Sequence, residues 1–522
     1  DELIHALLKS PVDLIWNGGI GTYVKSTQES HADVGDRAND AVRIDGHELQ
    51  AKVIGEGGNL GMTQRGRIEF AQAGGRLYTD AIDNSAGVNC SDHEVNIKIL
   101  LDGIVAQGDM TVKQRNELLA SMTDDVAKLV LRQNYLQPQA IELSAMQATA
   151  NLSLQQKFMQ YLESEERLDR AIEFLPSDEE IARRQKAGQG LTNPELSVLL
   201  AYGKMWVYDH LLESDVPDDG YFIQEMRKYF PTVLSERYFE QMQQNPLHRE
   251  IISTYLTNSL VNRLGIEDIY RMVDELGVSI SSVVKSYSVM RDVFDISQYW
   301  QLFEALDNQI DSQHQLTLEL CLRQDLTQSM YWLIQQFGED FDVTAVSTQL
   351  SDGMASLTRQ TFDNQPRTSY FRDYLDKLTA QYSDISLLQS HSATLPVSPQ
   401  VLDAVWFAKK NSQDVEQVTK VYFKAYELLH IDWLLMQVES LPQTSYWERR
   451  AAHALREDIM TTFRRYVSQF LAQPDPLSAI EAFASQRGDT LAELVQAKEG
   501  DLPITFAILS VLVNQLKEGI TD

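Results

Sequence analysis

The chain has 522 residues, 43% of them hydrophobic, which is enough for more than one domain and excludes a wholly disordered protein. Its net charge of −30 repels phosphate backbones, so we expect no nucleic-acid partner. Two cysteines, Cys90 and Cys321, exclude a disulfide framework and a four-cysteine zinc site. The sequence contains no apolar run long enough to span a membrane and no leader pattern, so we expect a cytoplasmic protein.

The first 108 residues hold 15 of the 26 glycines. Three apolar runs in this part each end in a polar or glycine-rich turn, which predicts strands at 12–17, 51–54 and 76–82. The segment 63–73 reads as a helix that ends at a Gly-Gly pair. Strand, helix and strand joined by short loops predict a parallel α/β unit, with all three turns at the ligand-binding edge of the sheet.

From about residue 95 the apolar residues follow a helical period, and capping patterns such as Thr111 with Gln114 mark helix starts. The predicted fold is therefore the later strands of a Rossmann-like parallel sheet followed by a large all-α region. We expect three parts, at 1–105, 106–388 and 400–522. The boundary near 389–399 rests on the polar, proline-containing stretch QSHSATLPVSP.

Two of the turns have chemistry that could bind a ligand. The turn 55–61 (GEGGNLG) is not a dinucleotide fingerprint, because Leu60 stands where the third glycine is needed. It is either an ordinary strand-to-helix turn or a turn whose backbone a flat or anionic ligand can approach closely. In the next turn, Asn84 could hydrogen-bond a carboxamide and Ser91 could hydrogen-bond a carboxylate. Alternatively, the segment is an ordinary capped helix start.

The sequence indicates no metal site and no catalytic motif. Cys90 and His93 have a metal-like spacing, but two ligands do not make a zinc site. Asp92, His93 and Glu94 are best interpreted as a solvated helix start rather than as acid–base groups. A nucleophile elbow, a Walker loop and an H-E-x-x-H motif are all missing from the sequence.

Residues 54–94 nevertheless resemble the glutamate dehydrogenase superfamily. The resemblance rests on Glu56-Gly57-Gly58-Asn59, then Asn84-Ser85-Ala86-Gly87-Val88, with Ser91 at the family's spacing from the asparagine. The sequence departs from the family pattern at three positions, each time with one small residue in place of another. Gly58 stands where the family has Ala, and Ser85-Ala86 stands where it has Ala-Gly. A proline before Thr63 is also missing. The opening DLIWNGGIGTYVK and the stretch LTNPELSVLLAYGK (191–204) are similar to the large bacterial NAD-specific glutamate dehydrogenases, which carry a long helical C-terminal region.

The resemblance implies an oxidoreductase that converts L-glutamate to 2-oxoglutarate and ammonia with NAD, as a homo-oligomer of a longer parent chain. The family's catalytic Lys and Asp would lie upstream, so we expect the chain alone not to oxidise glutamate, and no catalytic residue is assigned. Alternatives are a dehydrogenase of another amino acid and a non-catalytic helical scaffold or regulatory module. The residues implied to bind the cofactor are Asn17, Gly18, Glu56, Gly57, Gly58, Asn59 and Asn84, and those implied to bind substrate are Val88 and Ser91.

Overall fold

The computed structural model describes residues 1–358, 369–391, 396–442, 446–486 and 504–518. Within these ranges the chain is mostly helical, with two small parallel sheets of two strands each. It divides into two compact units, Asp1–Val284 and Lys285–Asp522. In the described ranges, every helix is too short or too polar to cross a membrane.

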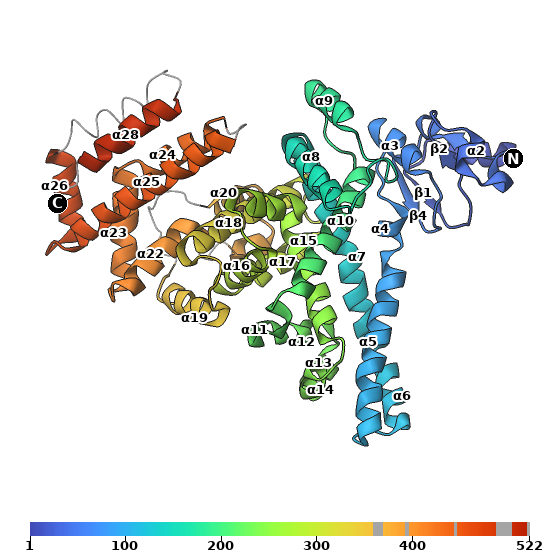
Figure 1. Ribbon diagram of the computed structural model, residues 1–522, viewed down its shortest axis with the longest axis horizontal. Coiled ribbons are helices and arrows are strands. Elements are labelled where there is room, and N and C mark those ends of the chain that lie inside the picture. The colour runs from blue at the N-terminus through green and yellow to red at the C-terminus, as the bar shows by residue number, and fades with distance from the viewer. Residues whose placement is uncertain (359–368, 392–395, 443–445, 487–503, 519–522) are drawn as a thin grey trace. The chain divides into compact units, whose positions relative to one another are not determined.

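The first unit carries all the described strands (Figure 1). Its elements are α1 (Glu2–Leu8), β1 (Leu14–Asn17), β2 (Val24–Lys25), α2 (His31–Val34), η1 (Arg37–Asn39), β3 (Ile44–Asp45), η2 (Gly46–Glu48), β4 (Val53–Glu56), α3 (Gln64–Gln72), α4 (Asp80–Asp83), α5 (Ser85–Gln107), α6 (Val112–Ser121), α7 (Thr123–Met146), α8 (Ala148–Ser164), α9 (Asp178–Ala187), α10 (Asn193–Glu213), η3 (Val216–Asp218), α11 (Gly220–Ile223), α12 (Met226–Tyr229), α13 (Thr232–Arg237), α14 (Phe239–Gln243) and α15 (His248–Leu276).

Strands β1 and β4 pair in parallel, with Asn17 opposite Glu56, so their carboxyl ends share one edge as predicted. The predicted helix at 63–73 is confirmed as α3, capped by Thr63. The predicted strand at 76–82 is wrong in extent. Only Arg76 bridges to β4, and the chain already turns into α4 at Asp80, because Thr79 starts a helix there. The strands β2 and β3 were not predicted, since each has only two residues.

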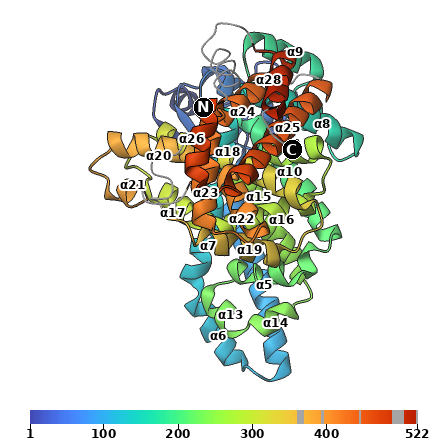
Figure 2. The ribbon, with the colours of Figure 1, turned by 90° about the vertical axis from the view of Figure 1, so that its left-hand side faces the viewer.

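The helical period starts earlier than predicted. Helix α5 begins at Ser85 and not near residue 95, so of the two interpretations of the segment after residue 82 the helix start is the one observed, without a side-chain cap from Asn84. Figures 1 and 2 show α5 running beside α7, and these two helices are in contact along their length. Helix α10 packs most extensively on α15, where Gly203 leaves room for Ile266 of the facing helix.

The second unit consists only of helices in its described part. Helix α16 (Ile280–Val293) contains the boundary between the units. The others are α17 (Ile296–Ala305), α18 (Ser312–Phe337), α19 (Val343–Met354), α20 (Tyr370–Gln381), α21 (Ser386–His391), α22 (Pro399–Lys410), α23 (Val415–Leu428), α24 (Ile431–Ser440), α25 (Tyr446–Leu471), α26 (Pro476–Gln486) and α28 (Phe506–Glu518).

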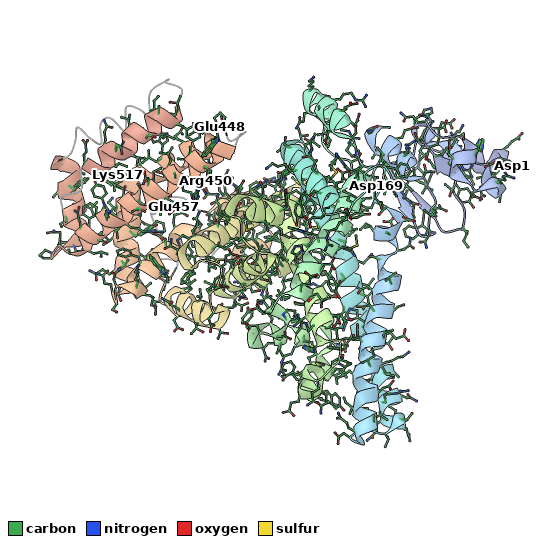
Figure 3. All side chains as sticks on the ribbon, viewed as in Figure 1. Asp1, Asp169, Glu448, Arg450, Glu457 and Lys517 are labelled. Atoms are coloured by element: carbon green, nitrogen blue, oxygen red, sulfur yellow. The ribbon has the colours of Figure 1, made fainter. Side chains whose placement is uncertain are left out.

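A buried carboxylate joins four helices of the second unit. Asp403 of α22 accepts hydrogen bonds from the indole of Trp332 (2.9 Å), the hydroxyl of Tyr422 (3.0 Å) and the guanidinium of Arg464 (3.0 Å). Near the surface, Lys517 (labelled in Figure 3) pairs with Asp458 at 2.9 Å and ties α28 to α25. The predicted boundary at 389–399 lies partly outside the described residues, and the three-part division remains a prediction.

Candidate functional site

The three predicted turns converge at the carboxyl edge of the β1–β4 sheet. The backbone N–H of Gly58 donates to the carbonyl oxygen of Asn17 (2.8 Å), which joins the first turn to the second. The backbone N–H of Glu56 donates to the carboxylate of Asp83 (2.8 Å), which joins the second turn to the third. Parallel pairing explains why the first two turns meet, because parallel strands end on the same side of a sheet, and Asp83 at the end of α4 brings the third segment to them.

Glu56 supports the second turn from inside. Its carboxylate is buried and forms a two-pronged ion pair with Arg67 of α3, with N–O distances of 2.6 and 2.9 Å. It also accepts a hydrogen bond from the backbone N–H of Met62 (3.1 Å). Burial by itself lowers the pKa of Arg67, but the hydrogen bonds and charges of Glu56 outweigh it and raise that pKa. The side chain of Glu56 therefore holds the turn on α3, and only its backbone faces the edge.

The glycines of the second turn accommodate the first turn. A methyl group on Gly55 or Gly57 would lie 2.6 to 2.7 Å from the indole of Trp16. On Gly58 it would lie 2.2 Å from the carbonyl oxygen of Gly19. These glycines are thus needed for the packing of protein against protein, whatever ligand approaches the edge. Leu60, which replaces the third fingerprint glycine, adopts a left-handed φ of 57°.

Asn84 is the best-defined ligand-binding candidate at this edge. Its Nδ2 donates to the backbone carbonyl oxygens of Glu56 (2.6 Å) and Asp80 (2.8 Å). Carbonyl oxygens only accept hydrogen bonds, so the orientation of the amide is determined and both of its N–H groups are engaged. Among the described residues nothing donates to Oδ1, so Asn84 presents one fixed acceptor.

The other predicted side chains lie nearby and make no hydrogen bond to another element in the described part of the chain. Asn17 is half-buried beside Gly61, and Asn59 is exposed. Val88 (76% exposed) and Ser91 lie one turn apart on the solvent face of α5, beginning one turn beyond Asn84. The hydroxyl of Ser91 bonds only its own helix, to the carbonyl oxygen of Gly87 at 3.3 Å. The structure thus brings Asn17, Glu56 and Asn84 together and leaves Val88 and Ser91 as an open helix face.

The prediction that 92–94 is a solvated helix start is wrong for His93. This residue lies inside α5 and is buried against the ring of Tyr229, at 4.5 Å between centroids. The hydroxyl of Tyr229 donates to Asp92 (2.6 Å) and accepts from Asn96 (2.7 Å), which ties α5 to α12. Burial lowers the pKa of His93, although Asp92 acts in the opposite direction.

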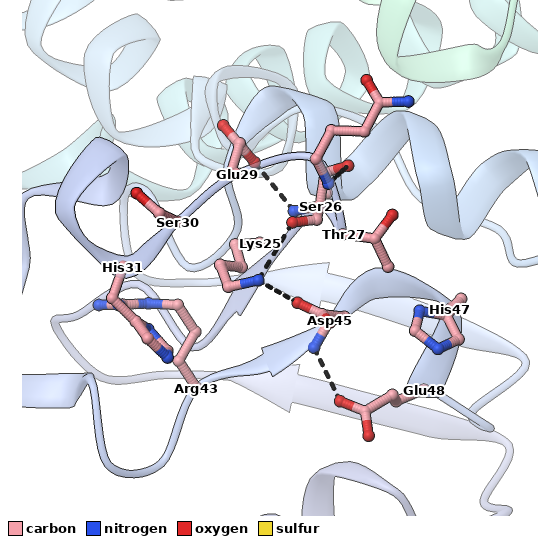
Figure 4. A network of polar contacts seen from close by, with 12 residues as sticks. Lys25, Ser26, Thr27, Glu29, Ser30, His31, Arg43, Asp45, His47 and Glu48 are labelled. Carbon is pink, nitrogen blue, oxygen red and sulfur yellow. Dashed lines mark hydrogen bonds and ion pairs between the residues drawn. The ribbon is translucent and has the colours of Figure 1, made fainter.

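Sequence reasoning missed a polar network around β2 and β3 (Figure 4). Lys25 is buried and pairs with Asp45 across the two strands. Glu69 of α3 accepts hydrogen bonds from Ser26 (2.7 Å) and Thr27 (2.8 Å). Burial raises its pKa, but these bonds and one from His47 outweigh it and lower the pKa to about 2. The signal in the sequence was the pair of capping patterns, Ser30 with Asp33 and Asp45 with Glu48.

The side chains at this edge are mainly amides. Within the described ranges, clusters of three or more His, Cys, Asp or Glu that could hold a metal ion are missing. The edge instead offers an oriented amide oxygen at Asn84 and a half-buried amide at Asn17, which suit the carboxamide and hydroxyl groups of a nicotinamide nucleotide.

Comparison with known proteins decides the family. A profile described as glutamate dehydrogenase, C-terminal, matches residues 188–518, and one described as bacterial NAD-glutamate dehydrogenase, catalytic domain, matches residues 1–144. The chain belongs to the glutamate dehydrogenase family. This confirms the resemblance drawn from residues 54–94 and 191–204.

Curated relatives extend the match over almost the whole chain. NAD-specific glutamate dehydrogenases from Pseudomonas aeruginosa, Halomonas elongata and Mycobacterium tuberculosis are 43%, 41% and 37% identical to it, over 92%, 88% and 99% of its length. The matched part is only 30%, 28% and 32% of those proteins. The chain thus spans about a third of the length of its glutamate dehydrogenase relatives.

The two profiles divide the chain between its sheet and its helices. The catalytic-domain profile covers β1 through most of α7, and so includes all of the strand-end turns. The C-terminal profile begins at residue 188, just before α10. A side-chain hydrogen bond joins the two matched regions: Glu142 of α7 accepts from Asn193 of α10 at 2.8 Å.

Proposed function

We propose that this chain forms one wall of the nicotinamide and substrate sites of an enzyme that oxidises L-glutamate to 2-oxoglutarate and ammonia. NAD, when bound, would supply the hydride acceptor. The observation that carries the proposal is Asn84, whose amide oxygen is oriented where the junction of α4 and α5 meets the turn after β4. The family membership and the names of the relatives support the choice of substrate and cofactor.

Each proposed binding residue has a distinct task. Asn84 Oδ1 would accept from the carboxamide N–H of the nicotinamide, and Asn17 and Asn59 would contact the adjacent ribose. The backbone of residues 56–58 and Gly18 would form the floor of this site. Val88 and Ser91 would face the substrate, with the Ser91 hydroxyl donating to the side-chain carboxylate of glutamate. None of these groups is placed to move a proton, so we assign them binding and orientation only.

We further propose that the β1–β4 sheet is part of a larger Rossmann-like sheet. Strand β1 is paired on one side only within the described residues. Its outward side chains Leu14 and Trp16 are 54% and 61% exposed. Another parallel strand at this edge would complete the hydrogen bonding of β1, and a covering layer would bury this apolar face. We place the complete enzyme in the cytoplasm as a homo-oligomer.

The proposal is tested in a protein of the relatives' full length that carries this chain. NADH formation is measured with glutamate, leucine and phenylalanine as substrates. Asn84→Ala should raise KM for NAD at least tenfold, because it removes an oriented acceptor and frees the third turn from Glu56. Asn116→Ala on the exposed face of α6 is the control and should leave KM unchanged.

Binding gives a second, independent measure. NAD should raise the unfolding temperature of the unsubstituted protein, and this rise should shrink in Asn84→Ala, because a ligand stabilises the state that binds it. A preference for leucine or phenylalanine as the substrate would show that the enzyme is a dehydrogenase of another amino acid. Absence of any NAD effect on stability and turnover would contradict the proposal and favour a helical scaffold.

A further inference from the structure

A chain of polar side chains connects the helical region to the first residue of α5. Lys204 of α10 donates from Nζ to the amide oxygens of Asn258 on α15 (2.9 Å) and Gln137 on α7 (3.3 Å). No described carboxylate pairs with this amine. Burial lowers the pKa of Lys204 to about 7, and its amine donates to two amide oxygens.

The chemistry of Lys204 determines the orientation of the next amide. In its protonated form Lys204 only donates, so the Oε1 atom of Gln137 faces Lys204, as observed. The Nε2 atom of Gln137 then faces the other way and donates to the hydroxyl oxygen of Ser85 (3.1 Å). The protonated form of Lys204 cannot accept and therefore favours this orientation of the Gln137 amide.

A second amide donates to the same hydroxyl. Nδ2 of Asn134 lies 2.8 Å from Ser85 Oγ and also donates to the carbonyl oxygen of Ile82 (3.3 Å). A hydroxyl oxygen has two lone pairs, and these two N–H groups engage both. The proton of Ser85 therefore has to be donated elsewhere, and no acceptor for it lies among the described residues.

Ser85 is adjacent to Asn84, and the two residues have complementary free groups. Asn84 has a free acceptor, as shown above, and Ser85 has a free donor. A carboxamide has one donor group and one acceptor atom, and a carboxylate has acceptors only. Ser85 stands where the family pattern described above has alanine, so this donor distinguishes the chain from that pattern.

We propose that Ser85 is a further ligand-binding residue, donating its hydroxyl proton to an oxygen of the ligand beside Asn84. Lys204 and Gln137 are positioning residues that keep this hydroxyl a donor. The inference rests on the proposed function, because the ligand oxygen would belong to the carboxamide of NAD or to a carboxylate of the substrate. Through Gln137 and Lys204, the helical region would thereby help to orient a ligand-binding hydroxyl.

The experiment uses the full-length protein and measures kcat, KM for NAD and KM for glutamate. Ser85→Ala should raise one of the two KM values about threefold to tenfold, the loss expected for one neutral hydrogen bond. Gln137→Glu should raise the same KM value by a similar factor. A carboxylate only accepts hydrogen bonds, so it would engage the hydroxyl proton of Ser85 that the ligand would otherwise receive. Ser85→Thr keeps the hydroxyl and should keep KM within twofold. Gln313→Glu, at an exposed position of α18, introduces the same negative charge away from the site and is the control.

The double variant separates positioning from a merely structural role. If Gln137 acts through Ser85, Gln137→Glu should change KM less than twofold in the Ser85→Ala background. A full effect in that background would overturn the positioning role, and unchanged KM values in Ser85→Ala would overturn the binding role. A rise for NAD alone identifies the carboxamide, and a rise for glutamate alone identifies a carboxylate. Failure of the proposed function differs from these results, because the unsubstituted protein would then form no NADH from glutamate.

Discussion

At the scale of single residues, the edge of the sheet is built by close backbone approach. Gly58 allows the carbonyl oxygen of Gly19 to come so near that no side chain fits between the two turns. The same approach brings the Gly58 N–H onto the Asn17 oxygen at 2.8 Å. Alanine occupies position 58 in the family pattern, so the first turn must lie farther out wherever that residue is present.

This packing predicts the effect of restoring alanine. Gly58→Ala should destabilise the first unit by about 1 to 3 kcal/mol, because its methyl group meets a backbone atom that cannot rotate away. Gly103→Ala in α5 meets no atom within 4 Å and should stabilise by up to about 1 kcal/mol through helix propensity. Urea unfolding of both variants checks the pair, and equal effects would contradict the packing argument.

At the scale of elements, buried polar contacts decide how helices attach to the sheet and to one another. The Glu56–Arg67 pair fixes α3 beneath the second turn. The contact between α5 and α12 instead places an uncharged histidine, His93, against Tyr229, with neither ring nitrogen hydrogen-bonded within the described residues. A buried imidazole without partners resists protonation, so this contact should be sensitive to acid.

The sign of that sensitivity follows from the lowered pKa of His93. Below about pH 6.5 the unfolded chain binds a proton that the folded chain binds less well, so stability falls as the pH falls. His93→Phe should remove up to about 1.4 kcal/mol per pH unit of this loss. Tyr229→Phe keeps the histidine and should keep the slope. Urea unfolding between pH 7.5 and 5 gives both slopes, and an unchanged slope in His93→Phe would exclude the histidine as the cause.

The sequence was informative about elements where periodicity and capping agree. It predicted α3, the parallel ends of β1 and β4, and the convergence of the strand-end turns. It failed at 76–82, where an apolar run looks like a strand but Thr79 and Asp80 start a helix. It could not find Arg67 as the partner of Glu56 or Gln137 as the partner of Lys204. Such contacts join residues distant in sequence, and no local pattern encodes them.

At the scale of the molecule, each of the two compact units has its own buried core and polar anchor. In the second unit the anchor is Asp403, which is fully buried and contacts α18, α23 and α25. Breaking a buried ion pair leaves an uncompensated charge in the interior, here that of Arg464.

Asp403→Ala should therefore destabilise the second unit by about 3 to 5 kcal/mol. Calorimetry should show a shifted transition for this unit while the transition of Asp1–Val284 stays in place. Asp376→Ala removes the exposed partner of Arg372 and should cost less than about 1 kcal/mol. A single transition that moves as a whole in Asp403→Ala would contradict separate cooperative units.

The indole of Trp16 lies directly over Gly55 and Gly57, and this has a consequence for the evolution of the chain. A side chain at either glycine would force the indole of Trp16 to move away from β4, and a smaller residue at position 16 would leave the two glycines uncovered. The three positions should therefore vary together among homologues. A glycine lost at position 55 or 57 should accompany a tryptophan lost at position 16, and this pairing would show as covariation even where overall identity is low.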